Sequence, residues 1–199
     1  MYFDSREFDD FSNKKDAYIE LLHHQLKDLI DKDETWIPEP FRMLKIKKQS
    51  GDYRELVIPS KIQDRIVIQA VLNIIAPEVE KVMSPNSFGH RISNNYSTSD
   101  DIFTPWTELY GNYHVKLRAF LDSPEEYYYL KGDIASFYPN IPVKDVIEKV
   151  QPFVKSEWSI NIISNFLDYQ IYQEDGSVVF PENKGLPQGP AYGHLLANV

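Results

Sequence analysis

Apolar and polar positions follow two different periods along the chain, and these periods predict a mixture of helices and strands. Apolar side chains recur every three or four residues over 13–32, which predicts an amphipathic helix. Pro38 and Pro40 follow it and predict an extended linker. Two alternating runs, 42–48 and 53–58, flank a turn that contains glycine, so we expect a β-hairpin there.

The middle of the chain has further helical patterns around a polar segment. Ser60 followed by Gln63 is a capping-box signature, and the helix that it opens is expected to break at Pro77. Residues 84–104 are polar and rich in Asn and Ser, which predicts a flexible loop. A second helix is expected over 105–121.

The last third of the chain again mixes the two periods. The run 127–134 predicts a strand that becomes buried towards its end. Two segments have the helical period, 143–153 and 160–171. A short hairpin is expected at Asp175–Gly176, and a final helix that begins near Gly189 and continues to Val199. Strands and helices in this irregular order predict an α+β fold.

Composition narrows the class of protein. The chain has 199 residues and no cysteine, which excludes disulfide frameworks, thiolate nucleophiles and zinc sites that need sulfur. No apolar run approaches the roughly 20 residues that cross a bilayer, and the first residues lack a signal-peptide pattern. We therefore expect a soluble, cytoplasmic protein without a membrane partner.

The distribution of charge is uneven. The net charge of -9 argues against a protein that coats nucleic acid non-specifically. Residues 42–65 reverse the sign, with seven basic side chains against three acidic ones. A confined basic patch suits a site for a compact anion better than a broad duplex footprint. Taken alone, the same patch could equally be the solvated face of a charged hairpin.

Residues 132–142, with the sequence GDIASFYPNIP, contain the first candidate chemistry. Asp133 ends the expected strand, and a carboxylate is costly to bury there unless it is paired or binds a metal. Carboxylate oxygens are ligands that suit Mg²⁺. By itself, Asp133 is equally compatible with a helix cap or a turn. Phe137 and Tyr138, taken alone, would more often be residues of the packed core.

Residues 185–198, with the sequence GLPQGPAYGHLLAN, form the second candidate segment. A loop rich in Gly and Pro lets the backbone approach a ligand closely. The helix N-terminus expected after Gly189 would favour a phosphate or a base edge. Without other information, the segment is an ordinary transition from loop to helix.

Together, these two segments resemble the palm motifs A and B of reverse transcriptases, particularly the bacterial retron, group II intron and abortive-infection or phage-defence types. Three further segments resemble their fingers motifs in the expected order: 54–60, 64–71 and 87–91. The resemblance implies the fingers and partial palm of a right-hand polymerase. It divides the chain into an amino-terminal helical extension (1–40), fingers (41–125) and a partial palm (126–199).

The resemblance also implies roles in motif A. Asp133 would be the first catalytic ligand of Mg²⁺, or of Mn²⁺ in its place, with the backbone carbonyl of Ile134 beside it. Tyr138 would lie beneath the sugar of the incoming nucleotide. Phe137, in the same nucleotide-binding segment, is expected to turn towards the core.

The other implied roles concern the basic hairpin and motif B. Arg54 and a lysine of the first hairpin arm, Lys47 or Lys48, would grip the triphosphate. Gln188 and Gly189 would line the nucleotide pocket and contact the template–primer. The basic charge of the hairpin would then neutralise a triphosphate.

These roles imply part of an RNA-directed DNA polymerase that adds dNTPs to a primer or a protein by two-metal nucleotidyl transfer, on an RNA or DNA template. The lineages that it resembles indicate a bacterial anti-phage defence or retroelement system. A non-coding RNA, a partner protein or a second copy of the chain are further expected partners. The alternative is a non-catalytic nucleic-acid-binding or assembly module that keeps the polymerase fold. An RNA-dependent RNA polymerase ranks lower, because its motif B is usually not built on Pro-Gln-Gly.

The chain also departs from the family pattern. Reverse transcriptases have a Tyr/Phe-x-Asp-Asp motif C after motif B, whereas the Asp pairs here, 9–10 and 100–101, precede motif A. The palm is therefore expected to stop before the Asp-Asp motif and to lack the thumb. We favour the amino-terminal part of a longer polymerase over a split or decayed product, because the final helix has no evident stop. The five histidines, His194 included, receive little weight.

Overall fold

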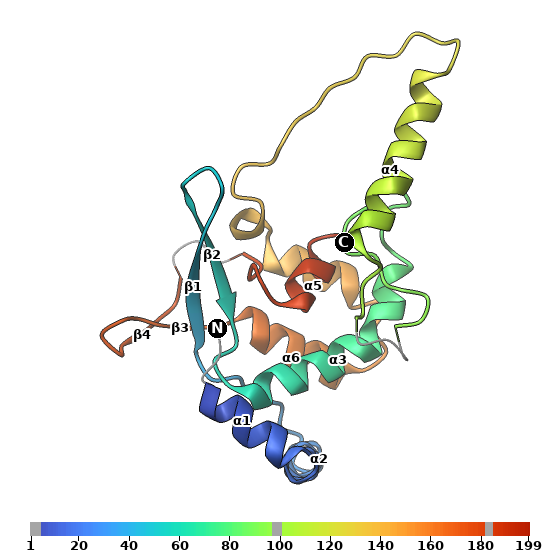
Figure 1. Cartoon of the computed structure of the whole chain (residues 1–199). Coiled ribbons are helices and arrows are strands. Elements are labelled where there is room, and N and C mark those ends of the chain that lie inside the picture. The colour runs from blue at the N-terminus through green and yellow to red at the C-terminus, as the bar shows by residue number, and fades with distance from the viewer. Residues whose placement is uncertain (1–4, 97–100, 182–184) are drawn as a thin grey trace.

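The computed structural model describes residues 5–96, 101–181 and 185–199. Within these residues a small sheet packs against several helices, and a long helix projects away from the body (Figure 1). Residues 97–100 of the predicted loop lie outside the described residues. The mixture of helices with a small sheet confirms the α+β prediction.

The predicted hairpin forms one half of the sheet, with its second strand at the edge. Strands β1 (Phe41–Lys47) and β2 (Tyr53–Ile58) are antiparallel, and the short β3 (Ile171–Tyr172) and β4 (Val178–Val179) form the second predicted hairpin. The order is β2-β1-β3-β4, with β3 parallel to β1. The sheet therefore joins segments that lie far apart in the sequence.

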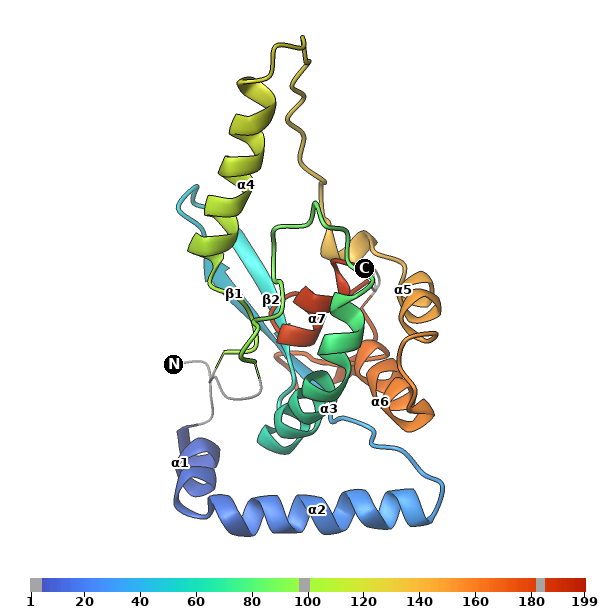
Figure 2. The same cartoon turned by 90° about the vertical axis from the view of Figure 1, so that its right-hand side faces the viewer.

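The core lies where α3 (Ile62–Glu80) meets α6 (Glu157–Leu167) and α7 (Ala191–Leu196). Figure 2 shows α7 beside α3, with α6 next to them. Their buried side chains are almost all apolar, which makes burial the main stabilising contribution. They include Val67, Val71, Leu72 and Ile75 of α3, Ile162, Ile163 and Phe166 of α6, and Tyr192, Leu195 and Leu196 of α7.

The N-terminal residues form two helices below the body. Helix α2 (Lys15–Asp31) confirms the helix predicted over 13–32, whereas α1 (Ser5–Asn13) was not expected. In Figure 2 α2 runs across the base of the molecule. No helix in the described part of the chain is both long enough and apolar enough to cross a membrane.

The start and the end of α3 differ from the prediction. Ser60 does not cap it: its hydroxyl is buried without a hydrogen-bond partner, and Lys61 is the N-cap. The helix also continues through Pro77 to Glu80. Proline costs the helix a hydrogen bond, but Ala76 and Val79 on either side are fully buried, and their burial offsets that loss.

The strand predicted over 127–134 is absent. The segment is extended, but no backbone hydrogen bond joins it to the rest of the described chain. Leu130 is 93% exposed and Ile134 65% exposed, so the segment does not become buried towards its end. A strand needs a neighbour that satisfies its backbone groups, and a pattern of side chains cannot supply one.

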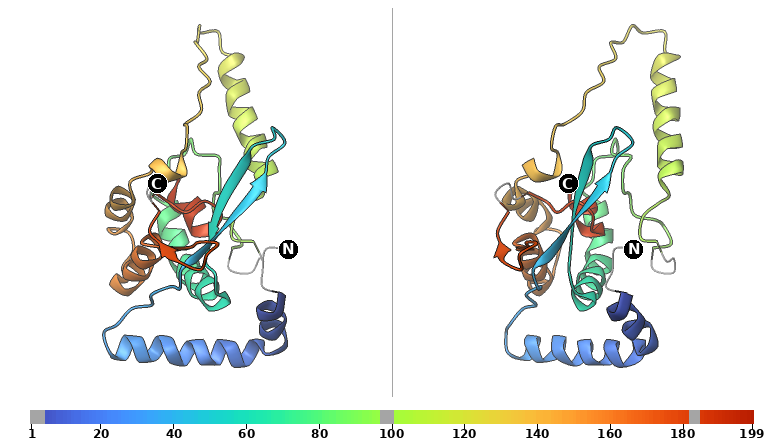
Figure 3. Two further views of the ribbon diagram at one scale, coloured as in Figure 1. Left: turned by 90° about the vertical axis from the view of Figure 1, so that its left-hand side faces the viewer. Right: turned by 60° about the vertical axis from the view of Figure 1, so that its left-hand side comes forward.

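The remaining helices agree with the sequence in position and differ at their ends. Helices α4 (Trp106–Leu121) and α5 (Val143–Val150) lie where they were predicted. The helix predicted over 160–171 ends earlier, at Leu167, and the last helix ends at Leu196 instead of Val199. In Figure 3 α4 and the segment that returns from it project from the body.

A buried carboxylate ties the linker before the sheet to α3. Asp64 is 2% exposed. The indole Nε1 of Trp36 donates a hydrogen bond to its Oδ1 at 2.8 Å, and the backbone N–H of Glu39 donates to its Oδ2 at 3.1 Å. Burial raises the pKa of Asp64 from 3.8 to about 6, although both hydrogen bonds act in the opposite direction.

This shift predicts how stability depends on pH. Because the folded state binds the Asp64 proton more tightly than the unfolded chain, its contribution to stability is full below about pH 4 and is lost as the pH rises through about 6. Relative to Asp64→Asn, the wild type should lose on the order of 2 kcal/mol of unfolding free energy between pH 4 and pH 7. Urea unfolding of both proteins measures this difference. If the unfolding free energies of the two proteins changed equally with pH, the raised pKa of Asp64 would be contradicted.

Candidate functional site

A cavity of about 490 Å³ lies between the β1–β2 hairpin and the loop before α7. Its lining contains three basic side chains and no acidic one among the described residues. It is lined by Ile46, Lys47, Lys48, Gln49, Arg54, Leu56, Gln188, Gly189 and His194. The structure therefore brings together five residues that the sequence singled out: Lys47, Lys48, Arg54, Gln188 and Gly189. We call this the basic cavity.

The alternation of β2 decides which side chains face the basic cavity. Arg54 and Leu56 line it, whereas Glu55 and Val57 line another cavity. Successive side chains of a strand point to opposite faces of the sheet, so the acidic side chain is kept away from the basic ones. This separation makes the basic cavity suitable for an anion.

The loop before α7 is fixed to the edge of β2. The backbone N–H of Val57 donates to the carbonyl of Gln188 at 2.8 Å. Gly189 has a φ of +133°, and a Cβ there would lie 3.3 Å from Cγ2 of Ile58. Both the conformation and the close approach favour glycine, which explains how this segment of the loop can lie against the strand.

Tyr138 connects motif A to the same loop. Its carbonyl accepts a hydrogen bond from the N–H of Leu186 at 3.0 Å, and a Cβ on Gly185 would lie only 2.1 Å from that carbonyl oxygen. Its hydroxyl lies 2.6 Å from Nδ1 of His194. Burial raises the pKa of Tyr138, while the charge of Arg54 lowers it, so the ring lies within the field of the basic cavity.

Two histidines at this site were missed by the sequence analysis. The ring of His194 stacks on that of His90, with centroids 4.3 Å apart and an interplanar angle of 5°. Burial lowers the pKa of His194 to about 4; His90 and Arg54 add to this, and a backbone hydrogen bond with Gly189 opposes it. The one available signal was that each histidine falls within a family-like motif.

The third family-like segment, 87–91, is tied to the end of α7 and to α3. Nδ2 of Asn198 donates to the carbonyl of Gly89 at 2.8 Å, and the Ser87 hydroxyl donates to Oδ1 of Asn198 at 3.1 Å. Nε of Arg91 donates to Oε1 of Glu80 at 2.7 Å. Segments far apart in sequence therefore meet beside the basic cavity.

No motif A candidate is among the residues that line the basic cavity, and Tyr138 lines the other cavity, with Glu55 and Val57. Asp133 is exposed on the extended segment, next to the exposed Ile134. Phe137 is 37% exposed, with its ring 5.5 Å from that of Tyr138, so it does not turn into the core as expected. Phe137 lies in a turn just before a short 3-10 helix (Tyr138–Asn140), where the side-chain alternation of a strand does not apply.

Asp133 and the carbonyl of Ile134 offer oxygen atoms that could bind a metal ion. Carboxylate and carbonyl oxygens are the donors that Mg²⁺ prefers. The described residues contain no group of three or more His, Asp or Glu side chains that could hold an ion. Asp133 and the Ile134 carbonyl therefore fit the ion in chemistry but do not complete its site by themselves.

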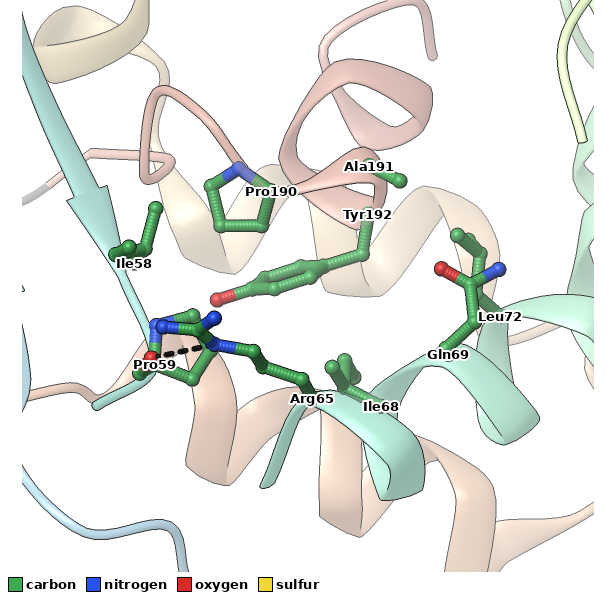
Figure 4. A pocket seen from close by; sticks show the side chains of 9 residues that line it. All are labelled: Ile58, Pro59, Arg65, Ile68, Gln69, Leu72, Pro190, Ala191 and Tyr192. Carbon is green, nitrogen blue, oxygen red and sulfur yellow. Dashed lines mark hydrogen bonds between the residues drawn. The ribbon is translucent and has the colours of Figure 1, made fainter. Parts of the chain in front are cut away.

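An apolar cavity of about 240 Å³ lies behind the loop, between the end of β2, α3 and the start of α7 (Figure 4). The ring of Tyr192 crosses it below Pro190, and its hydroxyl donates to the carbonyl of Phe166 at 3.3 Å. Nε of Arg65 donates to the carbonyl of Pro59 at 2.9 Å. The first of these hydrogen bonds ties the start of α7 to α6, and the second ties α3 to the residues that follow β2.

A basic hairpin that faces a Gly/Pro loop across a cavity, with the Tyr138 turn beside it, has the arrangement of the fingers and palm of a right-hand polymerase. The chain belongs to the reverse transcriptase (RNA-dependent DNA polymerase) family, because the model of that family matches residues 46–199. This match confirms the family and the fold that the motifs indicated.

Solved structures share the fold. A chain of a partial Cas6-RT-Cas1–Cas2 complex and a chain of a Cas6-RT-Cas1–Cas2 complex each match with a TM-score of 0.53 and 18% identity over 98% of this chain. This chain spans 31% and 19% of the lengths of those two chains. No curated protein matches it.

Proposed function

We propose that this chain forms the nucleotide-binding part of an RNA-directed DNA polymerase, which adds dNTPs to a primer or a protein on an RNA or DNA template. The observation that carries the proposal is the basic cavity, where Lys47, Lys48 and Arg54 face the Gln188–Gly189 loop. A triphosphate is a compact anion, and its negative charge complements the positive charge of these side chains. Membership of the reverse transcriptase family supports this choice of ligand.

Each side of the basic cavity has a distinct task in this proposal. The Arg54 guanidinium forms bidentate hydrogen bonds to phosphate oxygens, and Lys47 or Lys48 adds a point charge. The loop at Gln188 and Gly189 lines the nucleotide pocket and contacts the template–primer. Tyr138 lies beneath the sugar of the incoming nucleotide.

Motif A would supply this chain's ligands to a divalent metal ion. Bound Mg²⁺ or Mn²⁺ would stabilise the charge that develops during nucleotidyl transfer. Asp133 and the carbonyl of Ile134 are the groups that we assign to it. The basic cavity itself positions the triphosphate and neutralises part of its charge.

The proposal extends to the organisation and the setting of the protein. We assign 1–40 to a helical extension, 41–125 to the fingers and 126–199 to a partial palm. A bacterial anti-phage defence or retroelement system is the proposed setting, with a non-coding RNA, a protein or a second copy of the chain as partner. The resemblance of the motifs to those lineages supports this part of the proposal.

A second candidate is a non-catalytic nucleic-acid-binding or assembly module with the same fold. The exposed position of Asp133, away from any cluster of metal-binding side chains in the described chain, favours it. Dependence of primer extension on Asp133 separates the two candidates, as described in the Discussion.

Arg54→Ala should weaken the use of dNTPs far more than the binding of template–primer. Losing charge-assisted hydrogen bonds of about 1.5–3 kcal/mol raises the KM for dNTP by at least about tenfold. Steady-state primer extension and duplex binding by the polymerase that contains this chain measure the two effects.

Lys45→Ala is the matched control, because Lys45 belongs to the same hairpin but is not among the residues lining the basic cavity, and it pairs with Glu55 at 3.7 Å. It should leave the KM for dNTP nearly unchanged. Equal losses of dNTP use and duplex affinity in Arg54→Ala would mean that Arg54 contacts the duplex or supports the fold.

A further inference from the structure

Four aromatic rings, three of them from separate motifs, form a continuous contact beside the basic cavity. The edge of His194 meets the ring of Tyr138, with centroids 5.6 Å apart and an angle of 77°. On its other side His194 stacks on His90, and His90 meets Phe103 at 5.3 Å and 74°. The rings therefore connect motif A to the 87–91 segment through α7.

The hydroxyl of Tyr138 and Nδ1 of His194 are the polar link in this contact. They lie 2.6 Å apart. Since burial and neighbouring positive charges hold the pKa of His194 near 4, its imidazole is neutral at pH 7. In the tautomer with its proton on Nε2, the neutral Nδ1 accepts the hydrogen bond that the Tyr138 hydroxyl donates.

The two histidines are themselves held in place. The stacked ring of His90 limits rotation of His194, and Asn198 donates to the carbonyls of both Gly89 and His194. Tilting the Tyr138 ring would break its hydrogen bond in a half-buried place, where an unpaired polar group is costly. The Tyr138 ring therefore has one favoured position.

We propose that His194 is a positioning residue that holds the Tyr138 ring fixed against the nucleotide sugar, braced by His90, and that it thereby sets how strongly ribonucleotides are rejected. The inference rests on the proposed function, in which Tyr138 lies beneath that sugar. A tethered ring resists displacement by a 2′-hydroxyl more than a free ring does. Selectivity then depends on a residue that need not touch the sugar.

Two substitutions separate the hydrogen bond from the ring contact. His194→Asn keeps an acceptor close to the position of Nδ1, and His194→Phe keeps a flat ring that can stack on His90 but has no acceptor. In the polymerase that contains this chain, His194→Phe should raise the ratio of rNTP to dNTP kcat/KM by about tenfold, the effect of losing one hydrogen bond of ordinary strength. His194→Asn should stay within about threefold of the wild type, because the bond is retained.

A double-mutant cycle tests whether the two side chains act together. Tyr138→Phe keeps the ring and removes the hydroxyl, so it should raise the ratio about as much as His194→Phe. The double variant should raise it no further, since both substitutions remove the same bond. A purely structural role of His194 would lower the use of both sugars alike and leave the ratio unchanged.

Nitrogen NMR of the imidazoles in this 199-residue chain tests the contact without catalysis. His194 should be neutral at pH 7 with an unprotonated, hydrogen-bonded Nδ1, and Tyr138→Phe should shift that signal. A charged His194, or a signal unaffected by Tyr138→Phe, would overturn the inference.

Tyr138→Ala shows which part of the argument fails. If Tyr138→Ala relaxes selectivity while His194→Phe does not, the role proposed for His194 is wrong and the proposed nucleotide pocket stands. The same conclusion follows if His194→Asn and His194→Phe change selectivity equally. If Tyr138→Ala has no effect on selectivity, the placement of Tyr138 under the sugar is wrong, and the role of His194 falls with it.

Discussion

Tyr138→Ala is expected to let the polymerase that contains this chain accept ribonucleotides, lowering its preference for dNTPs by about two orders of magnitude. A 2′-hydroxyl facing the wild-type ring has to displace it or stay buried without a partner, which costs about 1–3 kcal/mol before any clash is added. Each 1.4 kcal/mol corresponds to about tenfold in selectivity. Much of the dNTP activity should remain, because Asp133 is untouched. Steady-state incorporation of dNTP and rNTP measures the ratio.

Phe137→Ala is the matched control for this prediction. Phe137 precedes Tyr138 in the same turn, but it is 37% exposed and lines neither of the two cavities beside the hairpin, whereas Tyr138 lines one of them. Its removal should therefore leave sugar selectivity unchanged. If Phe137→Ala relaxes selectivity and Tyr138→Ala does not, the register of motif A is wrong by one residue. If neither does, Tyr138 does not lie beneath the sugar.

Asp133→Asn is expected to reduce primer extension by at least about a thousandfold. The substitution keeps the shape of the side chain and removes the charge that a divalent ion requires, and several kcal/mol of charge stabilisation correspond to this factor. Because Asp133 is exposed, the unfolding free energy should change by no more than about 0.5 kcal/mol. Primer extension with Mg²⁺ and with Mn²⁺, together with urea unfolding, separates the two effects.

Asp145→Asn provides the comparison for a lost acidic side chain. Asp145 is also exposed and lies in the first turn of α5. It should leave primer extension within about twofold of the wild type, as expected for a surface substitution. Extension that survives Asp133→Asn would instead favour the non-catalytic module.

Local patterns predicted the fold well where neighbouring residues decide the structure. The hairpin of β1 and β2 and the positions of α2, α4 and α5 follow from periodicity and a turn. The prediction failed where residues far away in the sequence determine the local structure. Residues 127–134 have the pattern of a strand but no partner strand in the described chain. Pro77 was expected to end α3, but the helix continues past it because Ala76 and Val79 are buried.

The candidate site shows the same division. Lys47, Lys48 and Arg54 were found because they share one hairpin, and Gln188 and Gly189 because they share one motif. The meeting of His90, His194 and Tyr138 depends on tertiary packing, and no spacing in the sequence predicts it. The exposure of Phe137 was missed for a related reason, since the alternation of a strand does not apply to the turn that carries it.

The central claim is that the basic cavity binds the triphosphate of a dNTP, and NMR titration of the isotope-labelled chain with dTTP tests it most directly. We predict that the amide signals that move cluster at Arg54, Leu56, Gly189 and His194, the residues around that cavity. The shifts should be lost in Arg54→Ala and retained in Lys45→Ala. Shifts that instead gather around Leu72 in the apolar cavity behind the loop, or that persist unchanged in Arg54→Ala, would contradict the account.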